Sequence, residues 1–156
     1  MLTNIWMEPV LKIVLAGLLG ALLGFNRERA GKPLGFRTLS IVSIASCSLT
    51  VAAKQYDLSL DGDADTVGRA IQGLMAGIGF LGGGVILQTP RHHIRGLTTA
   101  AMVWLTAALG IACGLGARIA VTASAVTALA LLWAGGSLEK AMQRQRRSDT
   151  VRIVDR

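Results

Sequence analysis

The amino-acid sequence predicts an all-α membrane protein, a polytopic bundle of about five transmembrane helices. Long apolar runs separated by short charged loops are the first observation behind this prediction, and they lie at 10–25, 35–53, 70–87 and 97–134. A run of roughly 18–20 apolar residues spans a bilayer core as a helix, and the last run is long enough for two passes. The second observation is composition, because 52% of the 156 residues are hydrophobic and only 16% are charged.

The charge pattern predicts the orientation of the bundle. The net charge is +7, and most basic residues fall in loop 26–36, in loop 88–96 and in the tail after residue 136. The positive-inside rule places these segments in the cytosol. The N-terminus is then outside and the C-terminus inside. We expect a transmembrane domain at 1–136 and a basic cytoplasmic tail at 137–156, without a removable signal peptide.

Small and hydroxylated residues mark the first two predicted helices. The first, 10–25, carries Gly20 and Gly24, and this four-residue spacing lets transmembrane helices approach one another closely. The second, 36–54, contains four serines, whose hydroxyl groups can bond to their own helix or to a neighbouring one.

The remaining three helices are bounded by capping and turn residues. The third, 65–88, begins at Asp65, a residue type that caps helices well. The fourth and fifth, 98–114 and 117–135, are separated by a glycine-rich segment that we expect to form a tight turn. The two cysteines lie inside apolar runs, where we expect free thiols packed as small hydrophobic groups, with an interhelical disulfide as the alternative.

The middle of the third helix is unusually rich in glycine, with Gly73, Gly77, Gly79, Gly82, Gly83 and Gly84. Each glycine costs about 1 kcal/mol of helix stability relative to alanine. One interpretation is that these glycines form a packing groove for neighbouring helices. The other is that Gly82–Gly84 unwind, because breaks of this kind line cavities and mark binding sites in membrane proteins.

The start of the fourth helix is a second candidate site. We expect Thr98 or Thr99 to cap its exposed backbone N–H groups. A helix N-terminus attracts anions, and basic residues surround this one, namely Arg27, Arg29, Arg37, Arg91 and Arg95. The patch is read either as positive-inside charge that touches lipid phosphates or as a docking site for an acidic segment or phosphate group.

Three further polar residues have predicted roles. Glu28 is expected to pair with Arg37 or Arg95 and so to clamp the inner ends of three helices, with proton or metal handling as the alternative. Asp65 and Arg69 have the i,i+4 spacing of a helical ion pair. Gln72 is the amide well inside a span, and we expect it to make an interhelical hydrogen bond.

Several function classes find no support in the sequence. It has no zinc-type Cys/His spacing, no calcium-loop pattern in the acidic segment 57–65 and no nucleophile–base arrangement. We therefore expect no catalytic residues, no metal site and no cofactor, and the chain is not expected to be an enzyme. The expected partners are membrane lipids, a membrane-protein partner and, as a further option, a second copy of the chain, but no nucleic acid.

Three sequence blocks in order resemble the MgtC/SapB family of bacterial inner-membrane proteins. They are GFNRERAGKPLGFRT at 24–38, the D-x-x-x-R pair followed by GIGFLGGGVIL at 65–87, and RGLTTAAMVWLTAALGIACGLG at 95–116. The residues that match the family's pattern are Glu28, Gly31, Arg37, Asp65, Arg69, Gly77, Gly79, Gly82, Gly84, Arg95, Gly96, Thr98, Thr99 and Ala100. Asn26 and Gly83 depart from it, and the chain resembles a short form without the family's C-terminal ACT-like domain.

The resemblance implies a five-helix membrane domain in the bacterial inner (plasma) membrane. It further implies a regulatory protein for growth in low magnesium and for virulence-type stress, one that modulates membrane partners such as the F-type ATP synthase and does not itself carry magnesium. The first functional hypothesis is therefore a non-enzymatic membrane modulator. The second is a small Mg²⁺ or cation transporter or channel subunit, with the third helix broken at Gly82–Gly84 and Glu28 or Asp65 as a cation ligand.

Overall fold

A computed structural model of the chain describes residues 3–29, 34–59, 65–87, 96–132 and 134. Every regular element within these ranges is a helix, which confirms the all-α prediction. The chain separates into two compact units, Met1–Thr122 and Ala123–Arg156. The first unit holds the long helices.

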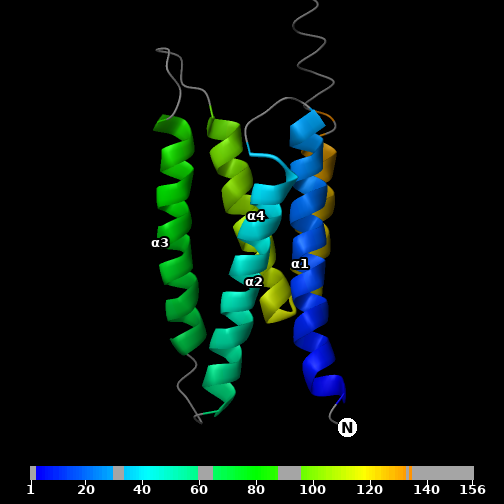
Figure 1. Ribbon diagram of the computed structural model, residues 1–156, viewed down its shortest axis with the longest axis vertical. Coiled ribbons are helices and arrows are strands. Elements are labelled where there is room, and N and C mark those ends of the chain that lie inside the picture. The colour runs from blue at the N-terminus through cyan, green and yellow to red at the C-terminus, as the bar shows by residue number, and fades with distance from the viewer. Residues whose placement is uncertain (1–2, 30–33, 60–64, 88–95, 133, 135–156) are drawn as a thin grey trace, which may run out of the picture. The chain divides into compact units, whose positions relative to one another are not determined.

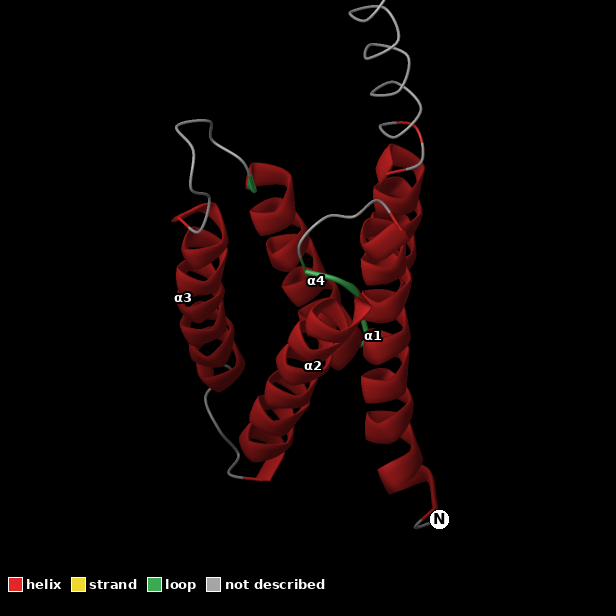
Figure 2. Cartoon of the chain, turned by 45° about the horizontal axis from the view of Figure 1, so that its top comes forward, coloured by secondary structure: helices red, strands yellow, loops and turns green. Residues whose placement is uncertain are grey.

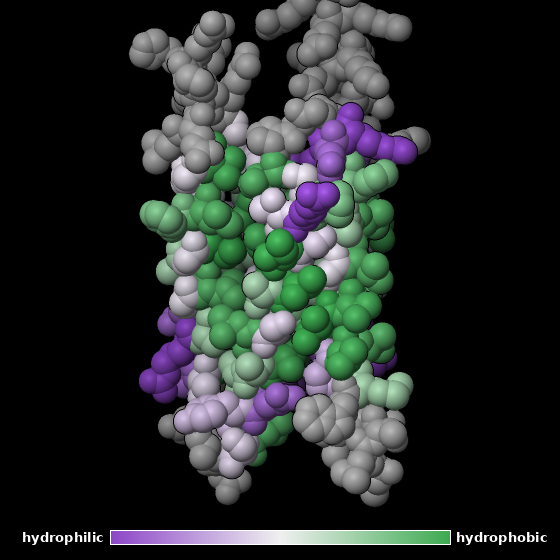
Figure 3. Space-filling view, in the orientation of Figure 1, coloured by the Kyte–Doolittle hydropathy of each residue, from purple (hydrophilic) through white to green (hydrophobic). Residues whose placement is uncertain are grey.

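The first unit contains four long helices, α1 (Thr3–Arg29), α2 (Phe36–Ser59), α3 (Asp65–Leu87) and α4 (Leu97–Leu115) (Figure 1). Each is long and apolar enough to cross a membrane, since about 20 residues at 1.5 Å per residue span a hydrocarbon core. A shorter apolar helix, Arg118–Leu132, follows. Apolar side chains cover most of the visible face and polar ones gather toward its two ends (Figure 3), as expected for a surface in lipid.

The helix boundaries lie close to the predicted ones for α3 and α4, whereas α1 and α2 are longer than predicted. α1 continues to Arg29 and α2 to Ser59, past the ends of their apolar runs. Polar residues do not end a helix by themselves, because backbone hydrogen bonds continue into the interface. The predicted turn after α4 is confirmed: Gly116 has the left-handed φ of 77° that suits glycine, and its N–H bonds back to the end of α4.

α2 is the central helix of the first unit. It packs against α1, α3 and α4, and α4 also packs against α1 and α3, whereas α1 and α3 do not touch one another. In both ribbon views α3 stands on one side, beside α4 and α2, and α1 stands on the other side of α2 (Figures 1 and 2). The chain runs alternately along the bundle, so the end of α1 and the starts of α2 and α4 lie at the same end (Figure 1).

Glycines bring α1 and α4 against the backbone of α2. A Cβ atom added to Gly20 would lie 2.6 Å from the carbonyl oxygen of Leu39 in α2. A Cβ on Gly114 of α4 would lie 2.7 Å from the Cβ of Thr50, and one on Gly110 would also collide with α2. The predicted close approach through Gly20 and Gly24 is confirmed, and α4 uses the same four-residue spacing.

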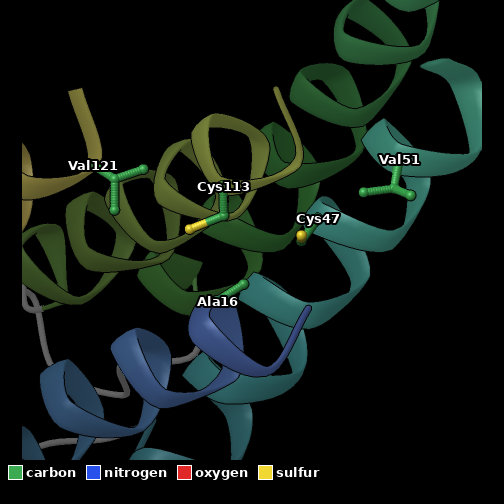
Figure 4. Packing of buried hydrophobic residues seen from close by; sticks show 5 residues of the cluster. All are labelled: Ala16, Cys47, Val51, Cys113 and Val121. Carbon is green, nitrogen blue, oxygen red and sulfur yellow. The ribbon is translucent and has the colours of Figure 1, made fainter. Parts of the chain in front are cut away.

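A small apolar cluster fills the space among these helices (Figure 4). It joins Ala16 of α1, Cys47 and Val51 of α2, Cys113 of α4 and Val121 of the following helix. Cys47 and Cys113 are free, buried thiols, which confirms the prediction and excludes the disulfide alternative. Three buried hydroxyl groups bond to carbonyl groups of their own helices, namely Ser46 to Val42, Thr50 to Ser46 and Thr106 to Met102. The buried Ser43 hydroxyl has no partner among the described residues.

Candidate functional site

α3 is a continuous helix through Gly82–Gly84, so the interpretation that this segment unwinds is wrong. The physical reason is the lack of water in a bilayer core. A backbone N–H or C=O group left unpaired there costs several kcal/mol, which outweighs the cost of about 1 kcal/mol for each glycine kept in a helix. The transporter hypothesis loses the broken helix on which it depended.

Most glycines of α3 do not pack against the rest of the described chain. A Cβ atom added to Gly73, Gly77, Gly79, Gly83 or Gly84 would meet no atom within 4 Å. Gly82 has neighbours in another helix, with Ala100 and Trp104 of α4 at 3.7 Å from the added atom, and Gly68 meets only Asp65 of α3 itself. The predicted packing groove is therefore wrong for contacts within the described part of this chain.

One side of α3 combines these glycines with a large aromatic residue. Gly73, Gly77, Phe80 and Gly84 recur at intervals of four, three and four positions, so they share one face of the helix, and all four are exposed. Phe80 is 86% exposed. We call this set of four residues the open glycine face.

Two predictions for polar residues of α3 have opposite outcomes. Asp65 and Arg69 form the predicted ion pair, at 3.1 Å between carboxylate oxygen and guanidinium nitrogen. Gln72 is exposed, and no hydrogen bond joins it to another described helix, so its predicted interhelical bond is not made within this part of the chain. Gln72 lies beside the open glycine face, one position before Gly73.

The start of α4 differs from the prediction. Its N-cap is Gly96, with a φ of 99° and no side-chain hydrogen bond, so neither Thr98 nor Thr99 is the cap. The first backbone bond of the helix runs from the Ala100 N–H to the Gly96 carbonyl, at 2.8 Å. Thr98 is exposed, whereas Thr99 is buried and accepts a hydrogen bond from the Arg27 guanidinium of α1.

Arg27 lies beside the start of α4, where the sequence predicts it, but its burial is unexpected. It was expected in a solvated inner loop, but it lies in α1 and is only 2% exposed. The Nη2 group of Arg27 donates a hydrogen bond to the Thr99 hydroxyl, while Nε and Nη1 are buried without a hydrogen-bond partner. A signal was available: Ala16, Gly20, Leu23 and Arg27 follow the spacing of one helix face, and all four are buried.

Glu28 joins two helices, but not through the predicted ion pair. Its carboxylate accepts a hydrogen bond from the backbone N–H of Phe36, the first residue of α2, at 3.3 Å. The Arg37 guanidinium instead lies over the Phe36 ring, 5.8 Å from its centroid. The predicted pairing of Glu28 with Arg37 is therefore wrong, and Arg95 lies outside the described residues.

Comparison with known proteins decides the family. The MgtC family model matches residues 13–141. This chain belongs to the MgtC family. The three sequence blocks at 24–38, 65–87 and 95–116 all lie within the matched range.

Relatives of this MgtC-family chain are found in different bacteria under the names SrpB, SapB and MgtC. Protein SrpB of Synechococcus elongatus is 40% identical over 70% of this chain and 66% of its own length. Protein SapB of Bacillus subtilis is 36% identical over 74% of this chain and 52% of its own length. Protein MgtC of Salmonella typhimurium is 36% identical over 69% of this chain and 43% of its own length.

The matched part of the chain therefore spans about two thirds of SrpB and about half or less of the other two relatives. No solved structure is significantly similar to it. Several apolar helices together with the family membership establish a membrane protein of the MgtC family.

Proposed function

We propose that the chain is a non-enzymatic, multi-pass protein of the bacterial inner membrane that binds and modulates another membrane protein during low-magnesium and virulence-type stress. The family supplies the link to magnesium and virulence. The open glycine face of α3 is the observation that supports binding to a second membrane protein.

The open glycine face is a poor surface to leave against lipid. Glycine lowers helix stability and contributes no side chain to contacts with acyl chains. Between two helices in a membrane the same residues are favourable, because small side chains let the backbones approach and gain van der Waals contact. Gln72 adds an amide next to this face, and an amide at membrane depth is best satisfied by a polar group of a neighbouring helix.

Photo-crosslinking tests the proposed surface. A photo-reactive amino acid replaces Phe80 on α3 or, as a matched control, Leu18 on α1, which is also apolar and 63% exposed. In membranes of the native bacterium the Phe80 position is expected to give a discrete adduct with another membrane protein, identified by mass spectrometry. An F-type ATP synthase subunit is the partner that the family resemblance implies.

The adducts also distinguish the alternatives. Leu18 is expected to give lipid adducts only. An adduct at Phe80 with the mass of two copies of the chain would assign the face to self-association, and the absence of any protein adduct there would contradict the proposal.

A growth test connects the surface to function. Gly77→Leu fills the open glycine face at a position where an added Cβ atom would meet no atom within 4 Å. Ala45→Leu makes a similar change at an exposed position of α2. In a strain lacking the chain, the control variant is expected to restore growth in low magnesium and Gly77→Leu is not, at equal abundance in the membrane. Full rescue by Gly77→Leu would contradict the proposal, as would magnesium flux into liposomes that hold the purified protein alone.

A further inference from the structure

The guanidinium of Arg27 is a buried charge without a counter-charge among the described residues. It is enclosed at the end of the bundle where α1 ends and α4 begins, and it is 2% exposed. One hydroxyl group, from Thr99, accepts from Nη2, while Nε and Nη1 have no partner. Removing a cation from water without pairing it is strongly unfavourable. An anion beside these two nitrogen atoms would therefore stabilise the arrangement.

No described carboxylate fills this role. Glu28 follows Arg27 directly in α1, but its carboxylate bonds to the Phe36 N–H at the start of α2. The other described acids, Glu8, Asp57 and Asp65, belong to the start of α1, the end of α2 and the start of α3, which lie at the opposite end of the bundle (Figure 1).

The N-terminus of α4 lies next to the Arg27 guanidinium. Thr99, the partner of Arg27, lies in the first turn of α4. That turn has no side-chain cap, and the first backbone bond of the helix uses the Ala100 N–H. The N–H groups of Leu97, Thr98 and Thr99 come before that bond and so have no acceptor within the helix, and they carry the positive end of the helix dipole. Two independent features, a buried cation and an uncapped helix start, thus converge.

We propose that Arg27, Thr99 and the first turn of α4 form a binding site for a phosphate-type oxyanion, supplied either by the headgroup of an anionic phospholipid or by free phosphate. A planar guanidinium matches two oxygen atoms of such an anion, and uncapped helix starts bind phosphate through their N–H groups. The Thr99 hydroxyl holds the guanidinium toward α4. A bound anion neutralises Arg27 and ties α1 to α4.

The test measures the stability of the full chain with each source of phosphate. Thermal unfolding is followed in a neutral detergent while inorganic phosphate replaces chloride at constant ionic strength, and separately in nanodiscs of phosphatidylcholine with or without phosphatidylglycerol. The wild type is expected to gain several degrees from phosphate, which identifies the free ion, or from phosphatidylglycerol alone, which identifies the headgroup. Native mass spectrometry counts the retained phospholipid.

Two arginine variants separate this site from general attraction to anions. Arg27→Met removes the guanidinium that is proposed to bind the anion, and the affinity of this variant for the anion is expected to fall at least about tenfold. Arg37→Met removes the same charge from the exposed start of α2 and is expected to keep the wild-type response. Arg27→Lys, which retains the charge without the planar fork, gives an intermediate response and serves if the methionine variant does not fold.

Equal responses of the wild type and Arg27→Met would overturn the proposal. So would a wild type that responds to neither phosphate nor phosphatidylglycerol.

Discussion

The glycines of α1 and α4 and the glycines of α3 have similar sequence spacing but opposite surroundings. In α1 and α4 they lie directly against the backbone of α2, where an added methyl group would collide. α3 has six glycines in its middle part. At five of them an added Cβ atom would meet no atom within 4 Å. The four-residue glycine spacing alone therefore does not predict a close helix contact within the chain.

The largest effect is expected from filling a contact with α2. Gly110→Leu forces a side chain into the backbone of α2 around Ser43, and overpacking of this kind costs about 3 kcal/mol. Unfolding in detergent–denaturant mixtures measures the loss. Gly77→Leu is the matched variant on α3, and its unfolding midpoint is expected to match or slightly exceed the wild-type value, because leucine favours a helix over glycine. Equal destabilisation by both variants would remove the contrast between the two regions.

The second prediction asks whether a polar contact also holds α1 to α4. Thr99→Val keeps the shape of the side chain but removes the hydroxyl that accepts from Arg27. A hydrogen bond to a charged group contributes about 1.5–3 kcal/mol, so a loss in this range is expected by the same unfolding measurement. Thr106→Val is the control, because that buried hydroxyl bonds only to Met102 of its own helix. A smaller loss for Thr99→Val than for the control would contradict the role of Arg27 as a link.

The third prediction is a substitution that stabilises the chain, whereas most substitutions lower stability. Gly84→Ala on α3 is expected to stabilise the isolated chain by up to about 1 kcal/mol, because alanine favours the helix and its methyl group meets no atom. Gly114→Ala is expected to destabilise, since its methyl group would lie 2.7 Å from Thr50 Cβ. Calorimetry of both variants in one detergent provides the comparison, and a loss of stability for Gly84→Ala would show that this glycine already has a neighbour.

The smallest effect concerns the ion pair at the start of α3. Asp65→Asn removes the bond to Arg69, in which both side chains are about two-thirds exposed. Exposed i,i+4 pairs contribute only about 0.3–0.5 kcal/mol, so the thermal midpoint is expected to shift by little more than its error. The shift is expected to vanish at high salt, and a large, salt-independent loss would assign Asp65 a different role.

The sequence predicted the helices well, because the apolar runs and their glycine and aspartate boundaries are local signals. α3 begins at Asp65 as expected and is helical through Leu87, the last residue described before the next loop. The site around Arg27 was harder to predict, because a charged side chain was expected to be exposed to solvent. Arg27 was assigned to a solvated loop, although the spacing from Ala16 through Gly20 and Leu23 placed it on a buried face. The pairing of Glu28 was missed for a related reason, since a backbone N–H competes with arginine for a carboxylate.

The glycine cluster of α3 shows a second limit. Local propensity suggested a break at Gly82–Gly84, and local spacing suggested contacts within the chain. Both expectations depend on what surrounds the helix. In the water-free core of a bilayer the continuous helix is favoured over an unwound segment, because its backbone groups stay hydrogen-bonded. The predicted orientation, with the N-terminus outside, follows from the distribution of charge and remains a prediction.

Cys47 and Cys113 have a practical consequence. Both thiols are enclosed among side chains from different helices, so a small alkylating reagent reaches them only when the interior separates. The rate at which such a reagent modifies the chain therefore measures how often the bundle opens. This measurement needs no added label, and it works in intact membranes.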